Sequence, residues 1–433
     1  MNNLRNVSWC RLAFCVAILA NVVAIAGEPQ LLPRTSLDEG WISLFDGETM
    51  FGWQPSGEAK WEVVDGEIRT DGARNGWLMT TTEWADFAIH FEFRAPAKSN
   101  SGVFMRSALN PKDPTKDCIE LNIAPRDNPF PTASFVGRKK IPVMTHPESI
   151  TEGKHRFTLE DPKEVDLWDD KWHTIEVGIV GHEAVRLCVD GEYLFEKIDL
   201  NGEKADGAKT PRLGFIGLQS KEGSAAFRNL RIWPRAWSQL FNRRDLEGWS
   251  TDRAEKCKFD VTQQGELHMS NGPGQIDTVA DFTNFVLHID CKANGDGLNS
   301  GVFFRTLREG WCAGYESQIQ NGFKDGDRTK PKDFGTGAIY RRQPARYVVP
   351  NDHEWFTKTI VADGPHMAVW VNGYQVSDWM DTRPPKENAR EGRRDAGGAI
   401  ALQGHDATTD FLFRNIRAVE LPRREDAVPD GEK

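Results

Sequence analysis

At 433 residues the chain is longer than one hydrophobic core usually supports, so we expect two domains. Charged residues make up 27% of the chain and hydrophobic residues 39%, as in ordinary folded proteins. The formal net charge of −10 argues against nucleic acid and anionic membranes as partners.

The first 26 residues have the pattern of a secretory signal peptide. Arg5 and Arg11 flank the start of an apolar run over residues 12–25, and Ala24-Ile25-Ala26 offers a small-residue cleavage site. The run is too short for a lasting anchor, and no cysteine stands at a lipoprotein-type site. We therefore expect a periplasmic or secreted protein without a membrane anchor. Cleavage would remove two arginines and no acids, which moves the net charge from −10 to −12.

Five cysteines follow this segment, so they cannot all pair within one chain. Their spacings match no zinc pattern, and we expect buried thiols rather than a metal centre. No metal or cofactor is predicted, and the sequence gives no signal of oligomeric state.

The main feature of the sequence is a unit that occurs twice. Asn100-Ser101-Gly102-Val103-Phe104-Met105-Arg106 returns as Asn299-Ser300-Gly301-Val302-Phe303-Phe304-Arg305. Further segments recur in the same order: 44–53 with 240–249, 86–91 with 284–289, 189–191 with 371–373, 216–219 with 400–403, and 227–229 with 413–415. Two copies of so long a unit indicate duplicated domains rather than a solenoid.

Each copy has β character. Apolar and polar residues alternate along residues 87–94, and Asp190-Gly191 and Asn372-Gly373 supply hairpin turns. We therefore predict an all-β protein of two tandem jelly-roll β-sandwiches that pack together without a flexible linker. The expected boundaries are 1–26 for the signal peptide, 37–235 and 236–421 for the sandwiches, and 422–433 for a disordered tail.

The repeated arginine has two interpretations. Strict alternation would place Arg305 on the same face as Phe303. Arg305 would then be either a structural group whose ion pair lies within the protein or a group of the functional site. Arg106 would be its counterpart in the first copy.

A second candidate stretch covers residues 315–320. As a strand it would carry Glu316, Gln318 and Gln320 on one face, and the first copy has Glu120 and Asn122 at the corresponding places. A row of this kind suits a concave, solvent-accessible sheet face, because burying polar groups without hydrogen-bond partners costs free energy. The alternative is a solvated outer face.

Further candidates lie near these strands in the second copy. Gln403 and His405 would share a face, whereas the first copy has Lys221 at the histidine position. Tyr340 adds a phenol, and indoles near loops can stack on sugars. Indoles near loops or strand ends are those of Trp77, Trp84, Trp311 and Trp379, of which Trp311 and Trp379 belong to the second copy. Asn299 completes the set. The polar side chains of a functional site are thus expected to concentrate in the second copy.

With these motifs assembled, the chain resembles a bacterial family of 3-keto-disaccharide hydrolases over about residues 40–234 and 237–421. The resemblance implies a concanavalin A-like jelly roll and cleavage of glycosides already oxidised to a ketone at carbon 3. It also implies a saccharide ligand. Paired carboxylates of the usual glycosidase kind are absent from the candidate strand, which offers only Glu316.

The implied chemistry is elimination. The ketone acidifies the hydrogen on carbon 2, so one base, one acid and a donor for the enolate oxygen are sufficient. Glu316 and His405 are the predicted base and acid in unassigned order, with Arg305 and Tyr340 at the oxyanion. The remaining second-copy candidates would bind substrate. Glu120, Asn122 and Arg106 are possible counterparts in the first copy, which is expected to be structural or to grip substrate.

Two alternatives remain open from the sequence. One is a carbohydrate-binding module without catalysis, because jelly rolls serve as lectins as readily as enzymes. The other is a metal-dependent variant, for which the sequence shows no clear ligand set.

Overall fold

A computed structural model describes residues 29–113, 115–141, 150–152, 155–157, 167–201 and 210–423. The predicted signal peptide and nearly all of the predicted tail lie outside these ranges. The predicted all-β fold is confirmed, because the chain forms two antiparallel sandwiches with a single short helix in the described part, α1 (Arg34–Glu39).

The first half of the chain forms a sandwich of an eight-stranded and a five-stranded sheet. The larger sheet runs β13 (Glu192–Asp199), β12 (Glu183–Val189), β11 (His173–Val180), β6 (Phe87–Arg94), β15 (Ala225–Pro234), β4 (Glu67–Thr70) and β3 (Glu62–Val64), with β1 (Ile42–Ser43) beside β15. The smaller sheet runs β2 (Trp53–Gly57), β5 (Gly76–Trp84), β14 (Gly214–Glu222), β7 (Asn100–Ser107) and β8 (Ile119–Ile123).

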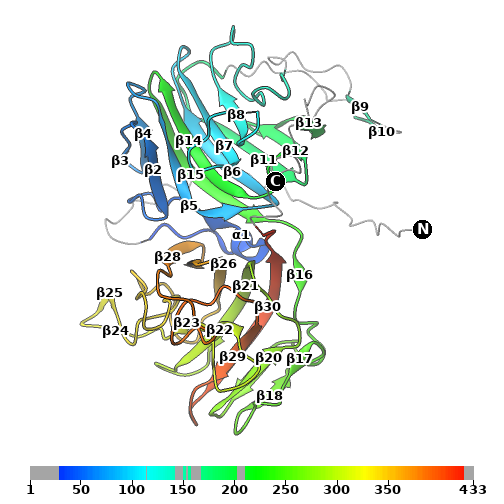
Figure 1. Ribbon diagram of the computed structural model, residues 1–433, viewed down its shortest axis with the longest axis vertical. Helices are drawn as coiled ribbons and strands as arrows, with labels where there is room; N and C mark the ends of the chain where they lie inside the picture. Colours follow the sequence, from blue (N-terminus) through cyan, green and yellow to red (C-terminus); the bar gives the residue numbers. More distant parts are fainter. Residues whose placement is uncertain are drawn as a thin grey trace.

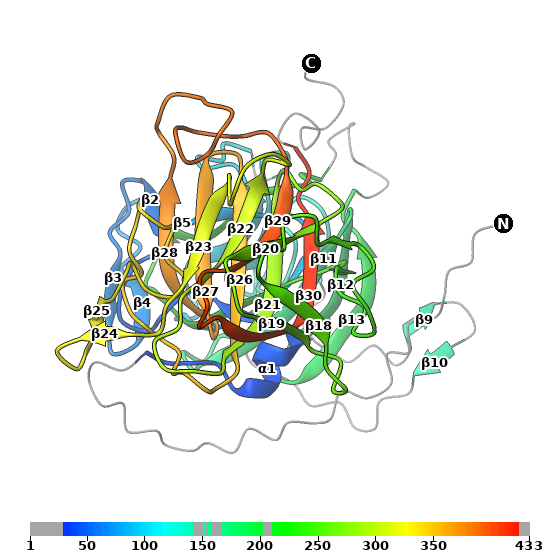
Figure 2. The same cartoon turned by 90° about the horizontal axis from the view of Figure 1, so that it is seen from below.

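The second half repeats this arrangement. Its larger sheet runs β18 (Lys258–Val261), β19 (Leu267–Ser270), β30 (Asp410–Glu420), β21 (Phe285–Ala293), β26 (Phe356–Asp363), β27 (His366–Val371) and β28 (Tyr374–Met380), with β16 (Ser238–Gln239) beside β30. Its smaller sheet runs β17 (Trp249–Ser250), β20 (Gly274–Thr278), β29 (Ala399–Gly404), β22 (Ser300–Thr306) and β23 (Tyr315–Ile319). Figure 2 shows β20, β29, β22 and β23 side by side.

Two short ribbons lie outside the sandwiches. They pair β9 (Ile150–Glu152) with β10 (His155–Phe157), and β24 (Phe323–Lys324) with β25 (Asp327–Pro331).

The core of each sandwich is formed by the strand faces that point toward the opposite sheet. In β6 the alternating side chains of Phe87, Ile89, Phe91 and Phe93 are at most 1% exposed. They belong to the same buried cluster as apolar side chains of the smaller sheet: Leu78, Val103, Leu121 and Leu218. Because successive side chains alternate between faces, the other face of the smaller sheet is left for polar groups.

The two sandwiches are stacked end to end, with α1 between them (Figure 1). The buried cluster of the first half continues into the second through Val286, Val361 and Trp370. Trp84 and Trp370 meet edge to face with ring centroids 5.9 Å apart. Arg346 forms an ion pair with Asp46 at 2.8 Å across the same junction. The halves are therefore joined by apolar packing as well as by polar contacts.

The repeated arginine is a structural clamp in both halves. Arg305 donates to the carbonyl oxygens of Thr283, Gly364 and Arg394 at 2.6–2.9 Å, and to Asn284 Oδ1 at 3.2 Å. Arg106 makes the same set of contacts in the first half, with Ala85, Gly181 and Pro211 as carbonyl acceptors and Asp86 as the side-chain acceptor. Each arginine is at most 1% exposed.

The prediction that Arg305 shares the face of Phe303 is wrong. Both clamp arginines have positive φ, +49° for Arg106 and +50° for Arg305. The strand register shifts at the same place, between Phe303 and Thr306. This bulge interrupts the alternation and turns the guanidinium away from the open face of the sheet.

Arg305→Met is therefore expected to lower the free energy of unfolding by about 3 kcal/mol or more, because it leaves several buried acceptors unsatisfied. Chemical denaturation at constant pH measures the difference. Arg244→Met, at an exposed position of the same half, is the control and should change stability by less than about 0.5 kcal/mol. A stable Arg305→Met protein would contradict the clamp.

Candidate functional site

The open face of the smaller sheet in the first half carries a pocket of about 320 Å³. The floor of the pocket is formed by residues that lie beside one another on neighbouring strands. In one row Gln219 pairs with Trp77 on one side and with Gly102 on the other. Gly102 in turn pairs with Asn122. The neighbouring row pairs Gly217 with Phe104 and Phe104 with Glu120. The wall is completed by residues of β7, β14 and the surrounding loops: Asn75, Asn100, Pro111, Lys112, Asn128, Val136, Ser220 and Lys221.

The glycine of the repeated motif makes room for the carboxylate in this pocket. A Cβ on Gly102 would lie 3.1 Å from Oε1 of Glu120, which is closer than such atoms usually approach. In the second half a Cβ on Gly301 would lie 2.5 Å from Oε1 of Glu316. The Asn-Ser-Gly sequence therefore allows a glutamate side chain to lie across the neighbouring strand.

Glu120 is a buried carboxyl facing an open pocket. Its residue is 5% exposed, and burial raises its pKa to about 7, with Lys221 acting in the opposite direction. Within the described ranges it forms no salt bridge or side-chain hydrogen bond. A carboxyl of this kind can exchange a proton near neutral pH, as a general base or acid requires.

Polar groups beside Glu120 are also without protein partners. Trp77 Nε1 and Gln219 Oε1 are buried and form no hydrogen bond in the part of the chain that the structure describes. Both side chains line the pocket, and exposed Lys221 lies at its edge. Unsatisfied buried donors and acceptors are costly, so these atoms favour a ligand rich in hydroxyl groups.

The corresponding face of the second half is covered. The backbone N–H of Cys312 donates to Gln275 Oε1 at 2.7 Å, and Gln403 Nε2 approaches Cys312 Sγ at 3.7 Å. Cys312 packs in a buried cluster with Phe303 and Ala401, which lie on the floor of this face. The loop that carries Cys312 therefore occupies the place where the first half has its pocket.

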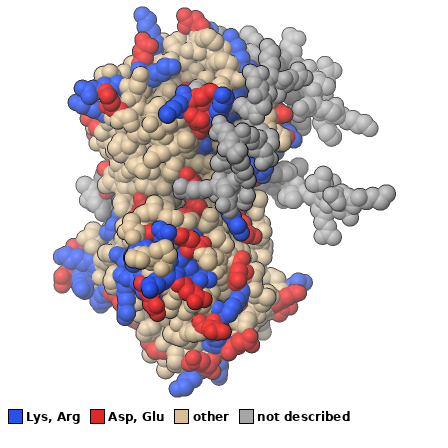
Figure 3. All heavy atoms as spheres, in the orientation of Figure 1, with Lys and Arg blue, Asp and Glu red and all other residues tan. Residues whose placement is uncertain are grey.

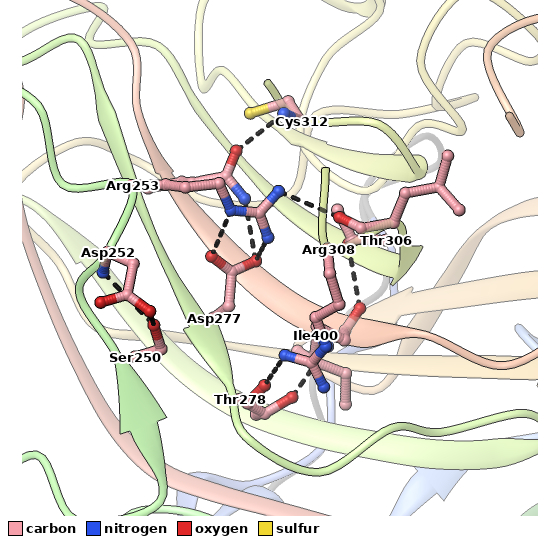
Figure 4. A network of polar contacts seen from close by, with 12 residues as sticks. Ser250, Asp252, Arg253, Asp277, Thr278, Thr306, Arg308, Cys312 and Ile400 are labelled. Carbon is pink, nitrogen blue, oxygen red and sulfur yellow. Dashed lines mark hydrogen bonds and ion pairs between the residues drawn. The ribbon is translucent and has the colours of Figure 1, made fainter. Parts of the chain in front are cut away.

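Arg253 holds this covering loop in position. It forms an ion pair with Asp277 at 2.5 Å (Figure 4). It also donates to the carbonyl oxygens of Leu307 at 3.0 Å and Gly310 at 2.7 Å. The first half has Met79 at the position of Asp277, because Met79 pairs with Gly217 as Asp277 pairs with Ala401, so this anchor is not present there.

Glu316 lies beside the covering loop, where its side chain lines a second pocket. Burial raises its pKa to about 7, and Arg390, which donates to its Oε2 at 3.1 Å, opposes that shift. Glu316 and Tyr340 line this second pocket, of about 270 Å³, together with Arg341, Arg342 and Arg390. Of the four residues predicted to be catalytic, the structure brings only these two together.

The other predicted residues lie elsewhere. Arg305 is in the clamp, and the side chain of His405 is 44% exposed, pairs with Asp406 at 2.9 Å and lines neither pocket. Trp311 is 41% exposed on the covering loop. Trp379 lies edge-on to Tyr315 with ring centroids 6.3 Å apart.

The amide side chains predicted to bind substrate in the second half donate hydrogen bonds to other groups of the protein. Gln318 Nε2 and Asn299 Nδ2 both donate to Asp333 Oδ2, at 2.8 Å and 2.9 Å. Gln320 Nε2 donates to the carbonyl of Gly297 at 3.0 Å, and Gln403 lies under Cys312. Gln318 Oε1, Asn299 Oδ1 and Gln403 Oε1 are nevertheless buried without a hydrogen bond to any described residue. The expectation that the polar groups of the site concentrate in the second half stays a prediction.

The repeat pattern predicts Glu120 and Asn122 as counterparts of the second-half candidates, and Trp77 is among the predicted sugar-stacking indoles, but the sequence does not indicate that these residues share one pocket. Trp77, Gln219 and Lys221 lie on two other strands, and only the register of those strands brings them to Glu120. The signal that could have found the last two is their alignment with Gln403 and His405. Nothing in the repeat pattern indicates Arg253, Cys312 or Arg390.

Within the described part of the chain no three His, Cys, Asp or Glu side chains come together in a group that could hold a metal ion. The absence of a metal or cofactor stays a prediction. The five cysteines after residue 26 are free thiols, and only Cys188 among them is not buried. No helix in the described ranges has the length and apolar character needed to span a membrane.

Comparison with known proteins agrees with the duplication. The family model of the 3-keto-alpha-glucoside-1,2-lyase-like domain matches residues 40–233 and again residues 236–418. The chain belongs to this family. A 3-keto-disaccharide hydrolase of Bacteroides thetaiotaomicron is 22% identical over 242 residues, which cover 45% of this chain and 78% of the relative.

Solved structures similar to this chain include two proteins of Parabacteroides distasonis described as glycosyl hydrolases. One is 20% identical with a TM-score of 0.36 and covers 48% of this chain and all of its own. The other is 26% identical with a TM-score of 0.35 and covers 43% of this chain and all of its own. A carbohydrate-binding module of Bacillus subtilis, at 17% identity and a TM-score of 0.29, covers 39% of this chain and 93% of its own.

The raised pKa of Glu120 predicts a pH-dependent stability change. Below the ordinary carboxyl pKa of 4.5 both folded and unfolded chains keep the proton, so burial carries no ionisation penalty. The penalty grows as the pH rises to about 7 and then stays constant. Glu120→Gln should therefore be more stable than the wild type at pH 8, by up to about 3 kcal/mol, and nearly equal to it at pH 4.

Denaturation of both proteins at several pH values measures this difference. Glu58→Gln, at an exposed carboxyl of the same half, is the matched control. A Glu120→Gln protein no more stable than the wild type at pH 8 would contradict the buried, unpaired carboxylate.

Proposed function

We propose that this protein cleaves glycosides whose sugar ring carries a ketone at carbon 3, and that the reaction takes place in the pocket of the first half. Family membership and the activity for which the Bacteroides thetaiotaomicron relative is named support the substrate class. The observation that carries the location is Glu120, a carboxyl with a pKa of about 7 and no protein partner within the described ranges, at the floor of an open pocket. Glu316 in contrast is paired with Arg390 beside a covered face.

The mechanism that suits this pocket uses one carboxylate. Glu120 takes the proton from carbon 2 of the ketosugar, and the electron pair of that C–H bond moves toward the ketone to form an enolate. The Lys221 ammonium lies beside Gln219 on β14 and would stabilise the negative charge on the enolate oxygen. A second catalytic carboxylate is not needed.

The glycosidic bond then breaks as the enolate collapses. The C1–O bond cleaves, a double bond forms between carbons 1 and 2, and the proton on Glu120 passes to the departing oxygen. Water adds across the double bond, with its hydroxyl to carbon 1 and its hydrogen to carbon 2. The products are the free 3-ketosugar and the alcohol, which balances hydrolysis of the glycoside.

The remaining groups of the pocket suit substrate binding. Trp77 offers an indole for a sugar ring, and its Nε1 and Gln219 Oε1 are free for ring hydroxyls. The same groups would serve a carbohydrate-binding module, but such a module has no need for a buried, ionisable Glu120. We also propose that the protein works outside the cytoplasm, because residues 1–26 have the pattern of an export signal.

Glu120→Gln should reduce cleavage of a 3-keto-disaccharide by about 10²–10⁴-fold, the usual contribution of a general base. Glu316→Gln should retain most of the activity, since that carboxylate is engaged by Arg390. Chromatographic measurement of released sugar gives the rates. In deuterated water the wild type should place deuterium at carbon 2 of the product.

The reverse pattern, with Glu316→Gln inactive and Glu120→Gln active, would move the reaction to the second half. Cleavage of the unoxidised parent disaccharide at a comparable rate would reject the elimination. Melting curves of both variants should accompany the rates, so that a folding defect is not mistaken for lost chemistry.

A further inference from the structure

The pocket beside Glu316 differs in charge from the pocket of the first half. It is lined by three arginines, Arg341, Arg342 and Arg390, against a single carboxylate, Glu316. The chain as a whole has a net charge of −10, so this excess of positive charge is local. Figure 3 shows basic side chains gathered on the second half, on the side where Figure 1 places β28.

Two structured segments present these arginines. Residues 339–343 are fixed beside β23 by bridges of Ile339 to Ser317 and to Gln343. The loop that carries Arg390 is held through Asp381, which accepts hydrogen bonds from Tyr315 Oη at 2.7 Å and from Arg383 Nη2 at 2.8 Å. The same Nη2 donates to the carbonyl of Ala389 at 2.9 Å. The arginines are therefore placed before any ligand arrives.

The two halves differ at the residues that carry these arginines. Tyr340-Arg341-Arg342 stands where the first half has Val136-Gly137-Arg138. The middle residue has positive φ in both, +58° at Arg341 and +68° at Gly137. This left-handed backbone favours glycine, so an arginine there is strained.

The three guanidinium groups are only partly used by the protein. Arg390 donates to Glu316 Oε2 at 3.1 Å and to the carbonyl of Cys312 at 3.2 Å. Arg342 donates to the carbonyl of Arg390 at 2.7 Å. Arg341 has no hydrogen bond or ion pair from its side chain to any described residue, and it lies over the ring of Tyr340 at 5.3 Å.

The electrostatics of this group favour an added anion. Burial lowers the pKa of Arg342, and the charge of Arg383 contributes in the same direction, as does that of Arg390. Like charges held this close repel one another. A carboxylate ligand would relieve that repulsion and could accept two parallel N–H bonds from one guanidinium.

We propose that this pocket binds the carboxylate of an acidic sugar residue, a hexuronate. Its volume of about 270 Å³ is just below the usual range for drug-sized ligands, which suits a single sugar ring. Tyr340 adds a phenol hydroxyl to the lining, and Glu316 provides acceptors for hydroxyl groups. Among the described residues, the first-half pocket is lined by five amide side chains and two lysines but by no arginine, so it offers no guanidinium to hold a carboxylate through two parallel bonds.

The proposal does not depend on the reaction proposed for the first half. It assigns the second half a binding role of its own, through which an acidic saccharide chain would be held by the same protein that carries Glu120.

Isothermal titration of the full protein with a disaccharide ending in glucuronate, and with its counterpart ending in glucose, tests the assignment. The acidic disaccharide should bind at least about tenfold more tightly than the neutral one. Arg341→Gln should remove most of that difference, because its side chain faces the ligand and makes no internal hydrogen bond among the described residues. Lys386→Gln, an exposed cation of the loop that carries Arg390 and outside the pocket lining, should bind like the wild type.

Equal binding of the two disaccharides, or wild-type binding by Arg341→Gln, would overturn the proposal. Inorganic sulfate or acetate that binds as tightly as the acidic disaccharide would show an anion site without sugar recognition, and would also overturn it. Arg341→Gln should cleave a neutral 3-keto-disaccharide at the wild-type rate. That readout keeps a failure of this proposal distinct from a failure of the reaction in the first half.

Discussion

A buried guanidinium group organises each sandwich of this protein. Arg106 and Arg305 each stand on a bulge at the end of the repeated motif, and each connects carbonyl groups from three separate segments of its half. Buried carbonyls need partners, and one planar group with five donors satisfies several of them at once. Because the bulge interrupts the strand alternation, it also directs the arginine away from the open face and leaves that face to the glutamate of the next strand.

The same scaffold therefore carries two pockets with different chemistry. In both halves a glycine makes room for a glutamate whose pKa burial raises to about 7. In the first half the floor around that glutamate is open. In the second half Arg253 and Asp277 anchor a loop over the floor, Cys312 fills it, and Arg390 pairs with Glu316. A few residue differences outside the repeated motifs thus distinguish an amide-lined pocket in one half from a covered face with an arginine-lined pocket at its side in the other.

The fold could be predicted from the sequence because its evidence is local and repeated. Alternation along residues 87–94 and the hairpin turns at Asp190-Gly191 and Asn372-Gly373 indicate strands without any tertiary information. The halves could be aligned through their motifs, and this alignment also showed that Glu120 and Glu316 hold equivalent positions in the two copies. The face of Arg305 could not be predicted in the same way, since the positive φ that redirects it has no signal in an alternating apolar strand.

The choice between the two halves also required the structure. The polar residues of the second-half motifs look better suited to catalysis, but Gln318, Gln320 and Asn299 form hydrogen bonds within the protein. Those bonds depend on Asp333 and Gly297, which lie in loops that carry no motif. The cover formed by Cys312 depends on Arg253, more than fifty residues earlier in the chain. Contacts at such sequence distance arise from strand register and loop conformation, which a single sequence does not reveal.

A crystal structure with a 3-keto C-glycoside, whose carbon–carbon anomeric bond resists elimination, would show which half binds the ketosugar. The ketosugar should lie in the first-half pocket, with its carbon 2 about 3–3.5 Å from a carboxylate oxygen of Glu120 and its ketone oxygen toward Lys221. A ketosugar bound instead between Glu316 and Tyr340, with the first-half pocket empty, would contradict the proposed location.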